Sequence, residues 1–120
     1  MNNTLLINHK HKTKMIAHRG LAGLRVENTL PSFILAANAS HYGIEFDVHR
    51  TRDGEFIIHH DEDFKRIYGS DVVIAENDYA TLLAASMSLG EENKIIRLID
   101  ILELCHQHNK KIILEIKAVL

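Results

Sequence analysis

Short apolar runs along the chain predict three β-strands. The first is MIAH at residues 15–18, which ends in a polar residue and leads into a segment with two glycines. The second is GIEFDV at 43–48, where Ile44, Phe46 and Val48 alternate with polar residues, as a period of two requires of a strand. The third is KKIILEIKAVL at 110–120. A tight turn at 52–54 and a short return segment ending at residue 61 follow the second strand.

Apolar stripes with helical spacing predict two helices between these strands. The residues of the stripes are Leu30, Phe33, Ile34 and Ala37 in the first, and Leu98, Ile101, Leu102 and Cys105 in the second. We expect both stripes to face the core. Thr29 is placed to cap the first helix, Pro31 falls in its first turn, and Asn109 can end the second helix. The segment 62–90 has a weaker pattern, with one helix predicted in 78–89.

The order strand, helix, strand, excursion, helix, strand is typical of βα units, which form parallel sheets. We therefore predict an α/β fold whose sheet is buried on both faces. Residues 1–14 are polar and basic without a sustained period, and they are interpreted as a flexible lead-in. Residues 15–120 then make up the folded domain.

Composition and charge narrow the classes of function. Of the 120 residues, 46% are hydrophobic and 25% are charged, which is typical of an ordinary globular domain. The net charge of −2 provides no basic field for nucleic acid or anionic lipid, so neither is an expected partner. No apolar run is long enough for a membrane span or a signal peptide. Cys105 is alone and has no partner for an internal disulfide, and we expect a cytoplasmic protein.

Acidic residues on the predicted strands indicate a cation site. Glu45 and Asp47 are two residues apart, so their side chains leave the same face of the second strand, and Glu115 with Lys117 repeats this spacing on the third. Carboxylates that converge on a buried sheet repel each other, and a divalent cation relieves the repulsion. Mg²⁺ and Ca²⁺ prefer oxygen ligands, whereas the spacings typical of zinc sites are absent from the sequence.

Histidines and cations accompany the acidic residues. His18 ends the first strand with Arg19 directly after it, and His60 ends the return segment. Two imidazoles that exchange protons, with cations that neutralise a phosphate, suit phosphoryl chemistry. Taken singly, each of these residues is explained as well by a solvated strand face, a strand end or a turn. Their concurrence at successive strand ends favours a site, because α/β folds place their sites there. The other histidines are interpreted as bystanders: His9, His11, His41, His49, His59, His106 and His108.

Four motifs in series carry a family resemblance. They are IAHRG at 16–20, ENTLPSF at 27–33, GIEFDVHRTRDGEFIIHHD at 43–61 and LEIK at 114–117. Together, in this order and spacing, they resemble the glycerophosphodiester phosphodiesterases. The resemblance implies a TIM (β/α)₈ barrel, a divalent cation, and hydrolysis of glycerophosphodiesters to glycerol 3-phosphate and an alcohol.

Roles for individual residues follow from the same resemblance. It implies that Glu45, Asp47 and Glu115 bind the metal, that His18 and His60 are general acid and base, and that Arg19 and Lys117 hold the phosphate. Supporting roles fall to Asp61, which would orient the His60 loop, and to Glu27 with Asn28, which would shape the rim beside the first strand. Which histidine is the acid stays open. The chain departs from the family pattern at 62–70 and at 95–102, which bears on substrate choice.

Length is the larger departure from the family. A barrel of this type takes about 250 residues, whereas only three of its strands are found here. We therefore expect a barrel truncated after the third strand, with an exposed apolar edge at 112–116 and either self-association or a missing C-terminal half. The alternatives to an active enzyme are an inactive fragment or subunit that binds cation or phosphate, and a chain without a stable fold. A related lipid phosphodiesterase is the nearer alternative.

Overall fold

The structure, a computed structural model, describes residues 16–20, 25–39 and 43–117. The strands are β1 Ile16–His18, β2 Gly43–Arg50, β3 Phe56–Ile58 and β4 Lys111–Ile116. The α-helices are α1 Leu30–Ala37, α2 Lys65–Tyr68, α3 Tyr79–Ala85 and α4 Leu98–Gln107, and short 3₁₀ segments are Ile74–Glu76, Ser86–Leu89 and Glu91–Asn93. The predicted lead-in at 1–14 lies outside the described residues.

Strand β2 is the centre of the sheet. It pairs in parallel with β1 and with β4, and antiparallel with β3. Val48 pairs with Ile58 of β3 and also with Ile116 of β4, so β3 and β4 lie on opposite sides of β2. The parallel pairing predicted from the βα order is confirmed.

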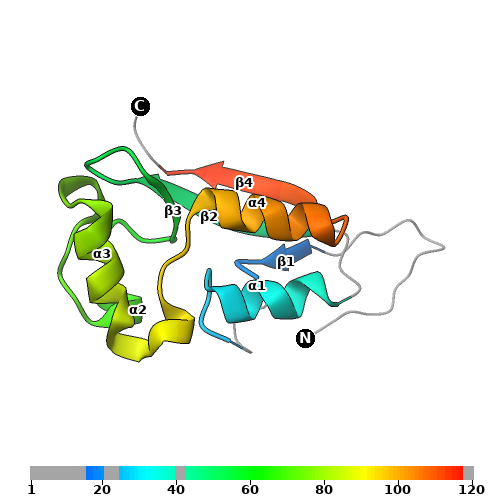
Figure 1. Cartoon of the computed structure of the whole chain (residues 1–120), viewed down its shortest axis with the longest axis horizontal. Coiled ribbons are helices and arrows are strands. Elements are labelled where there is room, and N and C mark those ends of the chain that lie inside the picture. The colour runs from blue at the N-terminus through cyan, green and yellow to red at the C-terminus, as the bar shows by residue number, and fades with distance from the viewer. Residues whose placement is uncertain (1–15, 21–24, 40–42, 118–120) are drawn as a thin grey trace.

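Helices α1 and α4 lie side by side across the sheet (Figure 1). Their buried residues join those of β1, β2 and β3 in one core: Ala17, Phe33, Ala36, Ala37, Ile44, Phe46, Val48, Ile58, Ile96, Ile101 and Cys105. The second predicted stripe is confirmed, since Ile101 and Cys105 are buried and Leu98 and Leu102 pack against this core. Asn109 follows the C-cap residue of α4, His108, and has a φ of 55°, the left-handed conformation that ends a helix, as predicted.

The first predicted stripe was wrong at two positions. Leu30 and Ile34 are 40% and 44% exposed, whereas Phe33, Ala36 and Ala37 are buried. Successive helical residues are about 100° apart, so a helix that contacts the sheet through Phe33 turns Ile34 toward solvent. The two alanines allow the helix to approach the sheet closely along this face.

The predicted side-chain cap of α1 was also wrong. Thr29 occupies the N-cap position, but its hydroxyl makes no capping hydrogen bond and donates instead to the carbonyl of Val26. Pro31 stands in the first turn of the helix, as predicted. The hydroxyl of Thr29 therefore stabilises the loop before the helix rather than the end of the helix.

The excursion between β3 and α4 forms a second small core at one end of the molecule (Figure 1). Its buried residues are Ile57, Phe64, Tyr68, Ile74, Leu82 and Ile95. Helix α3 falls within the predicted range 78–89, whereas the single turn of α2 has too few residues to give a periodic signal. This lobe holds the loop after β3 in place, and that loop carries His60.

Strand β4 contradicts the prediction of a sheet buried on both faces. All six of its residues are exposed, with Ile113 at 45% and Ile116 at 58%. The strand pairs with β2 along one edge, and α4 covers the sheet without burying β4. The apolar exposure expected at 112–116 is therefore present. Within the described residues, no helix is long and apolar enough to cross a membrane.

Candidate functional site

The carboxyl ends of the parallel strands bring the predicted site residues together. In the register of the sheet, His18 of β1 lies opposite Glu45 of β2, and Asp47 lies opposite Glu115 of β4. The period of two places Glu45 and Asp47 on one face of β2, as predicted. Lys117 lies one residue beyond β4, where its backbone N–H donates to the carbonyl of Val48.

Three carboxylates form an acidic cluster, which consists of Glu45, Asp47 and Glu115. One oxygen from each lies within 4.8 Å of the others. Asp47 is only 1% exposed. Burial raises the pKa of Glu45, and the nearby charge of Asp47 adds to this effect. Glu115 is more exposed, and the hydrogen bond from Lys117 Nζ, at 2.9 Å, lowers its pKa.

One oxygen of Asp47 is already engaged by nitrogen atoms. Asn28 Nδ2 donates to Asp47 Oδ2 at 3.3 Å, and Arg19 Nε lies 3.5 Å from the same oxygen. Among the described residues, Arg19 Nε and Asn28 Oδ1 are buried without a hydrogen-bond partner. Buried polar atoms without partners are uncommon, and an acceptor oxygen beside clustered carboxylates matches the ligand chemistry of a hard cation or its bound water. The residues present therefore fit a divalent cation.

The turn after β1 holds Arg19 in an unusual backbone conformation. Arg19 has a φ of 55°, Gly20 one of 75° and Asn28 one of 57°. The N–H of Arg19 donates to the backbone carbonyl of Glu45 at 2.7 Å and lies 3.2 Å from its carboxylate Oε1. The N–H of Asn28 donates to the carbonyl of Arg19 at 3.0 Å. Left-handed residues at these positions turn the chain sharply, so Arg19 and Asn28 both reach Asp47.

Replacing Gly20 with Ala is expected to destabilise this turn strongly. A Cβ atom at Gly20 would lie 2.8 Å from the carbonyl carbon of Ser32 and would also clash with the Ser32 hydroxyl. Together with the left-handed φ, this overlap should lower the free energy of unfolding by about 2–5 kcal/mol in urea denaturation. Gly69 is the matched control, because it has a φ of 71° and a Cβ there would meet no atom within 4 Å. Gly69→Ala should cost only about 1–2 kcal/mol. Equal losses in the two variants would contradict the clash.

The loop after β3 places His60 at the same end of the sheet. The N–H of His59 donates to the carbonyl of Asp47 at 3.0 Å, and the ring of His49 contacts the carbonyl of His60 through Nε2 at 2.9 Å. His60 Nδ1 lies 2.8 Å from Asp61 Oδ1. His18 Nε2 lies 3.5 Å from Glu45 Oε1, on a side chain that is 65% exposed.

Two histidines interpreted as bystanders support the His60 loop. His49 is buried at the carboxyl end of β2, on the face that carries Glu45 and Asp47, and the alternation of the strand was a signal for it. His59 is buried against Phe64, and burial lowers its pKa to about 4. A neutral imidazole is therefore part of the second core. No sequence period identifies this contact.

Arg66 is a further residue that the sequence did not single out. Its guanidinium donates to both Asp61 and Glu27, and Glu27 also accepts hydrogen bonds from Arg19. Arg66 lies on α2, inside the weakly patterned segment, and no periodic or motif signal distinguished it. These contacts connect the residues near β1 with those near β3.

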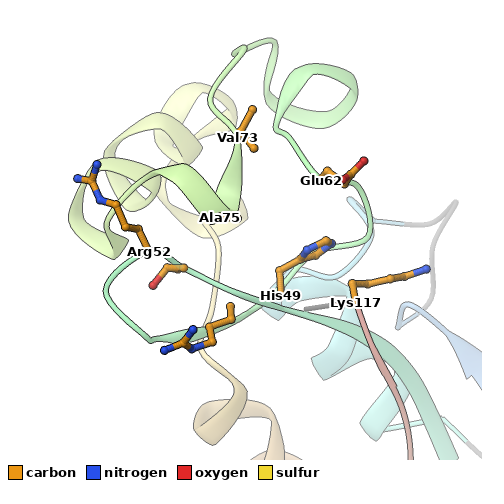
Figure 2. Close-up of a pocket in the computed structure, with 8 residues that line it drawn as sticks. His49, Arg52, Glu62, Val73, Ala75 and Lys117 are labelled. Carbon is orange, nitrogen blue, oxygen red and sulfur yellow. The ribbon is translucent and has the colours of Figure 1, made fainter. Parts of the chain in front are cut away.

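An open groove lies at the carboxyl end of β2, lined by His49, His60 and Lys117 among others. One part has a volume of about 580 Å³ and is lined by His49, His60, Asp61, Glu62, Asp63 and Lys117. A neighbouring part of about 270 Å³ shares His49, Glu62 and Lys117 with it and extends toward Arg52. Figure 2 shows His49 and Lys117 at the base of this second part, with Glu62 and Val73 on the chain that follows β3. The lining of the groove combines cations, imidazoles and carboxylates.

Known proteins are similar to this chain in sequence and in fold. The model of the glycerophosphoryl diester phosphodiesterase family matches residues 18–119. A glycerophosphodiester phosphodiesterase of Bacillus altitudinis is 35% identical over 102 residues, which cover 81% of this chain and 42% of the relative. A human lysophospholipase D is 39% identical over 70 residues, which cover 58% of this chain and 22% of the relative.

Solved structures agree with the sequence relatives. A glycerophosphodiester phosphodiesterase from Thermotoga maritima aligns with a TM-score of 0.76 and 34% identity, covering 88% of this chain and 44% of the other. A phosphodiesterase from Oleispira antarctica, in complex with the product sn-glycerol-3-phosphate, aligns with a TM-score of 0.79 and 32% identity, covering 89% and 45%. These alignments confirm the prediction of parallel βα units of a TIM (β/α)₈ barrel. The chain spans less than half the length of these relatives.

Proposed function

Because the chain belongs to the glycerophosphoryl diester phosphodiesterase family, we propose that it hydrolyses glycerophosphodiesters to glycerol 3-phosphate and an alcohol. The observation that carries this proposal is the convergence of the acidic cluster, two histidines and two cations at the carboxyl ends of adjacent strands. The similarity to a phosphodiesterase that holds sn-glycerol-3-phosphate supports the substrate class.

The acidic cluster is proposed to hold the divalent cation, Mg²⁺ or Ca²⁺. Glu45, Asp47 and Glu115 offer oxygen ligands within 4.8 Å of one another, and the raised pKa of the partly buried Glu45 favours a positive neighbour. When bound, such a cation neutralises negative charge on the phosphate. Asn28 and Arg19 contact one carboxylate oxygen of Asp47, which leaves the other oxygen to bind the cation.

The two histidines are proposed to move protons during the reaction. With Nδ1 of His60 hydrogen-bonded to Asp61, its Nε2 is the atom that exchanges a proton with the substrate. One imidazole takes a proton from the water whose oxygen forms the new P–O bond. The other gives a proton to the alkoxide that leaves as the ester P–O bond breaks, so the products are glycerol 3-phosphate and the alcohol. His18 Nε2 lies 3.5 Å from Glu45 of the acidic cluster, which suits the partner role.

Arg19 and Lys117 are proposed to bind the phosphate oxygens. In the structure Arg19 contacts Glu27 and Asp47, and Lys117 contacts Glu115, so both cations already stand at the acidic cluster. A phosphate placed there would meet one planar guanidinium and one ammonium group. Glu27 would keep Arg19 in this position.

Release of glycerol 3-phosphate tests the proposal directly. The purified chain is incubated with glycerophosphocholine and either Mg²⁺ or Ca²⁺, and again with excess chelator. We expect turnover with cation and its loss with chelator, restored by added cation, because the acidic cluster loses its charge balance without the ion. A folded chain that releases no glycerol 3-phosphate under any of these conditions would contradict the proposed activity of the chain by itself.

A second candidate function is favoured by the exposure of β4. Ile112, Ile113, Leu114 and Ile116 are each at least 39% exposed, and the chain covers less than half of its relatives. We infer that the alternative is a subunit that binds a cation without turnover. Such a subunit would gain the rest of a barrel by self-association or from a partner. It predicts cation-dependent stabilisation in the absence of hydrolysis, together with a larger mass in light scattering.

The similarity to a human lysophospholipase D supports a lipid phosphodiesterase as the alternative activity, with lysophospholipids as the alternative substrate class. Both substrate classes share the phosphodiester and differ in the group beyond it. Parallel assays with glycerophosphocholine and with lysophosphatidylcholine separate them, since each releases a different phosphate product.

A further inference from the structure

The guanidinium of Arg66 joins the loop after β3 to the loop before α1. Toward the loop after β3, its Nε donates to Asp61 Oδ2 at 2.9 Å and its Nη2 to Asp61 Oδ1 at 3.1 Å. Toward the loop before α1, its Nη1 donates to Glu27 Oε1 at 3.1 Å and its Nη2 to Glu27 Oε2 at 2.8 Å. Arg66 thus makes two forked contacts with carboxylates, and a forked contact fixes orientation as well as distance.

These contacts keep both carboxylates ionised. Hydrogen bonds from Arg66 hold the pKa of Asp61 well below its usual range. Burial would raise the pKa of Glu27, but the hydrogen bonds and charge of Arg66 outweigh burial and lower it. An ionised carboxylate has no proton to donate, so Asp61 accepts a hydrogen bond from His60. The proton of a neutral His60 ring therefore lies on Nδ1.

His60 is held at two points, and Arg66 acts on only one of them. Its backbone carbonyl contacts His49 Nε2, which fixes the loop. Its ring contacts Asp61, and Asp61 is oriented by Arg66. We expect the first contact to persist when Arg66 is replaced, because it involves only the His49 ring and the backbone of His60, so the two contacts can be separated by experiment. The ring alone depends on the Arg66 fork.

The stability of the chain should depend little on this fork. The Arg66 side chain is 48% exposed, and ion pairs near the surface contribute about 0–1 kcal/mol to folding. Glu27 also has a second partner in Arg19. A contribution to folding stability is thus a weak explanation for the four hydrogen bonds that Arg66 donates to Asp61 and Glu27. Orientation of the His60 ring through Asp61 explains why these contacts are forked.

We propose that Arg66 is a positioning residue, which acts through Asp61 to hold the His60 ring with Nδ1 protonated and Nε2 toward the groove. This role rests on the proposed function, in which His60 exchanges a proton with substrate. Through Glu27, the same guanidinium ties the His60 loop to the loop that carries Arg19. One residue therefore sets the relative position of a proton carrier and a phosphate ligand.

The test measures the His60 ring directly and needs no turnover. Imidazole ¹⁵N resonances of the full chain, assigned by comparison with His60→Gln, report which ring nitrogen carries the proton. Arg66→Gln is expected to move the tautomer equilibrium about tenfold toward the Nε2–H form, because Asp61 loses its orientation. Arg66→Lys keeps the charge but not the fork and should give an intermediate value. Arg97→Gln is the matched control, since Arg97 is 47% exposed, makes a surface pair with Asp100 at 3.9 Å and does not line the groove.

A second readout is the steady-state kinetics of Arg66→Gln, in which the change in kcat is compared with the changes in KM and in cation affinity. Arg66→Gln should lower kcat for glycerophosphodiester hydrolysis about 10–100-fold with little change in cation affinity. An unchanged His60 tautomer in Arg66→Gln would overturn the positioning role, whether or not the chain hydrolyses substrate. A shifted tautomer in a chain without turnover would support the positioning role while contradicting the proposed function.

Discussion

His60→Gln is expected to lower kcat for release of glycerol 3-phosphate by about 10²–10⁴-fold, the range typical of losing one general acid or base. Glutamine occupies similar space but has no group that titrates near neutral pH, so proton transfer at Nε2 is lost. His18→Gln should have an effect of the same order. Steady-state kinetics with saturating Mg²⁺ or Ca²⁺ measure both.

Cation binding should be retained in the same variants. Neither histidine belongs to the acidic cluster, so the rise in melting temperature with added cation should match that of the unsubstituted chain. His106→Gln is the control, since His106 is exposed in the last turn of α4. If His18→Gln and His60→Gln kept full turnover, two-histidine catalysis would be excluded.

Asp47→Asn is expected to weaken cation affinity by at least ~100-fold, equivalent to ~2.7 kcal/mol. The amide keeps the shape of the side chain but removes one of the three negative charges in the cluster, and hard cations depend on ligand charge. The ion pair with Arg19 is lost as well. Isothermal titration with Ca²⁺ and with Mg²⁺ measures the change.

Asp78→Asn is the matched control for this substitution. Asp78 is a carboxylate about half exposed, paired with Arg52 at the start of α3 and outside the acidic cluster. Asp78→Asn and Asp47→Asn each replace one carboxylate with an amide, so any effect of net charge on cation affinity appears in both variants. Equal cation affinity in Asp47→Asn and Asp78→Asn would show that the ion does not bind at the acidic cluster.

Much of the site could be predicted because local patterns encode it. The period of two along β2 placed Glu45 and Asp47 on one face, and the apolar runs in the sequence located strands β1 and β4. Motifs in series indicated His18 and His60 without any knowledge of their distance. Each of these predictions depends on residues close together in the chain.

Other features could not be predicted, because they depend on contacts between distant segments. The spacing of apolar residues predicted that Leu30 and Ile34 are buried in the core, but the face that α1 turns toward the sheet leaves both side chains exposed. Arg66 lies in a segment without periodicity, and its partner Glu27 is 39 residues away. His49 and His59 gain their roles from burial around the His60 loop.

The sequence by itself determined the order of strands and helices, the family motifs and the residue types of the site, since period and spacing follow from local backbone geometry. The tertiary structure alone decided that Asp47 lies opposite Glu115, that Arg66 joins Asp61 to Glu27, and that β4 is left exposed. The physical reason is that register, ion pairs and burial depend on which distant segments meet, and local propensity carries no information about that meeting.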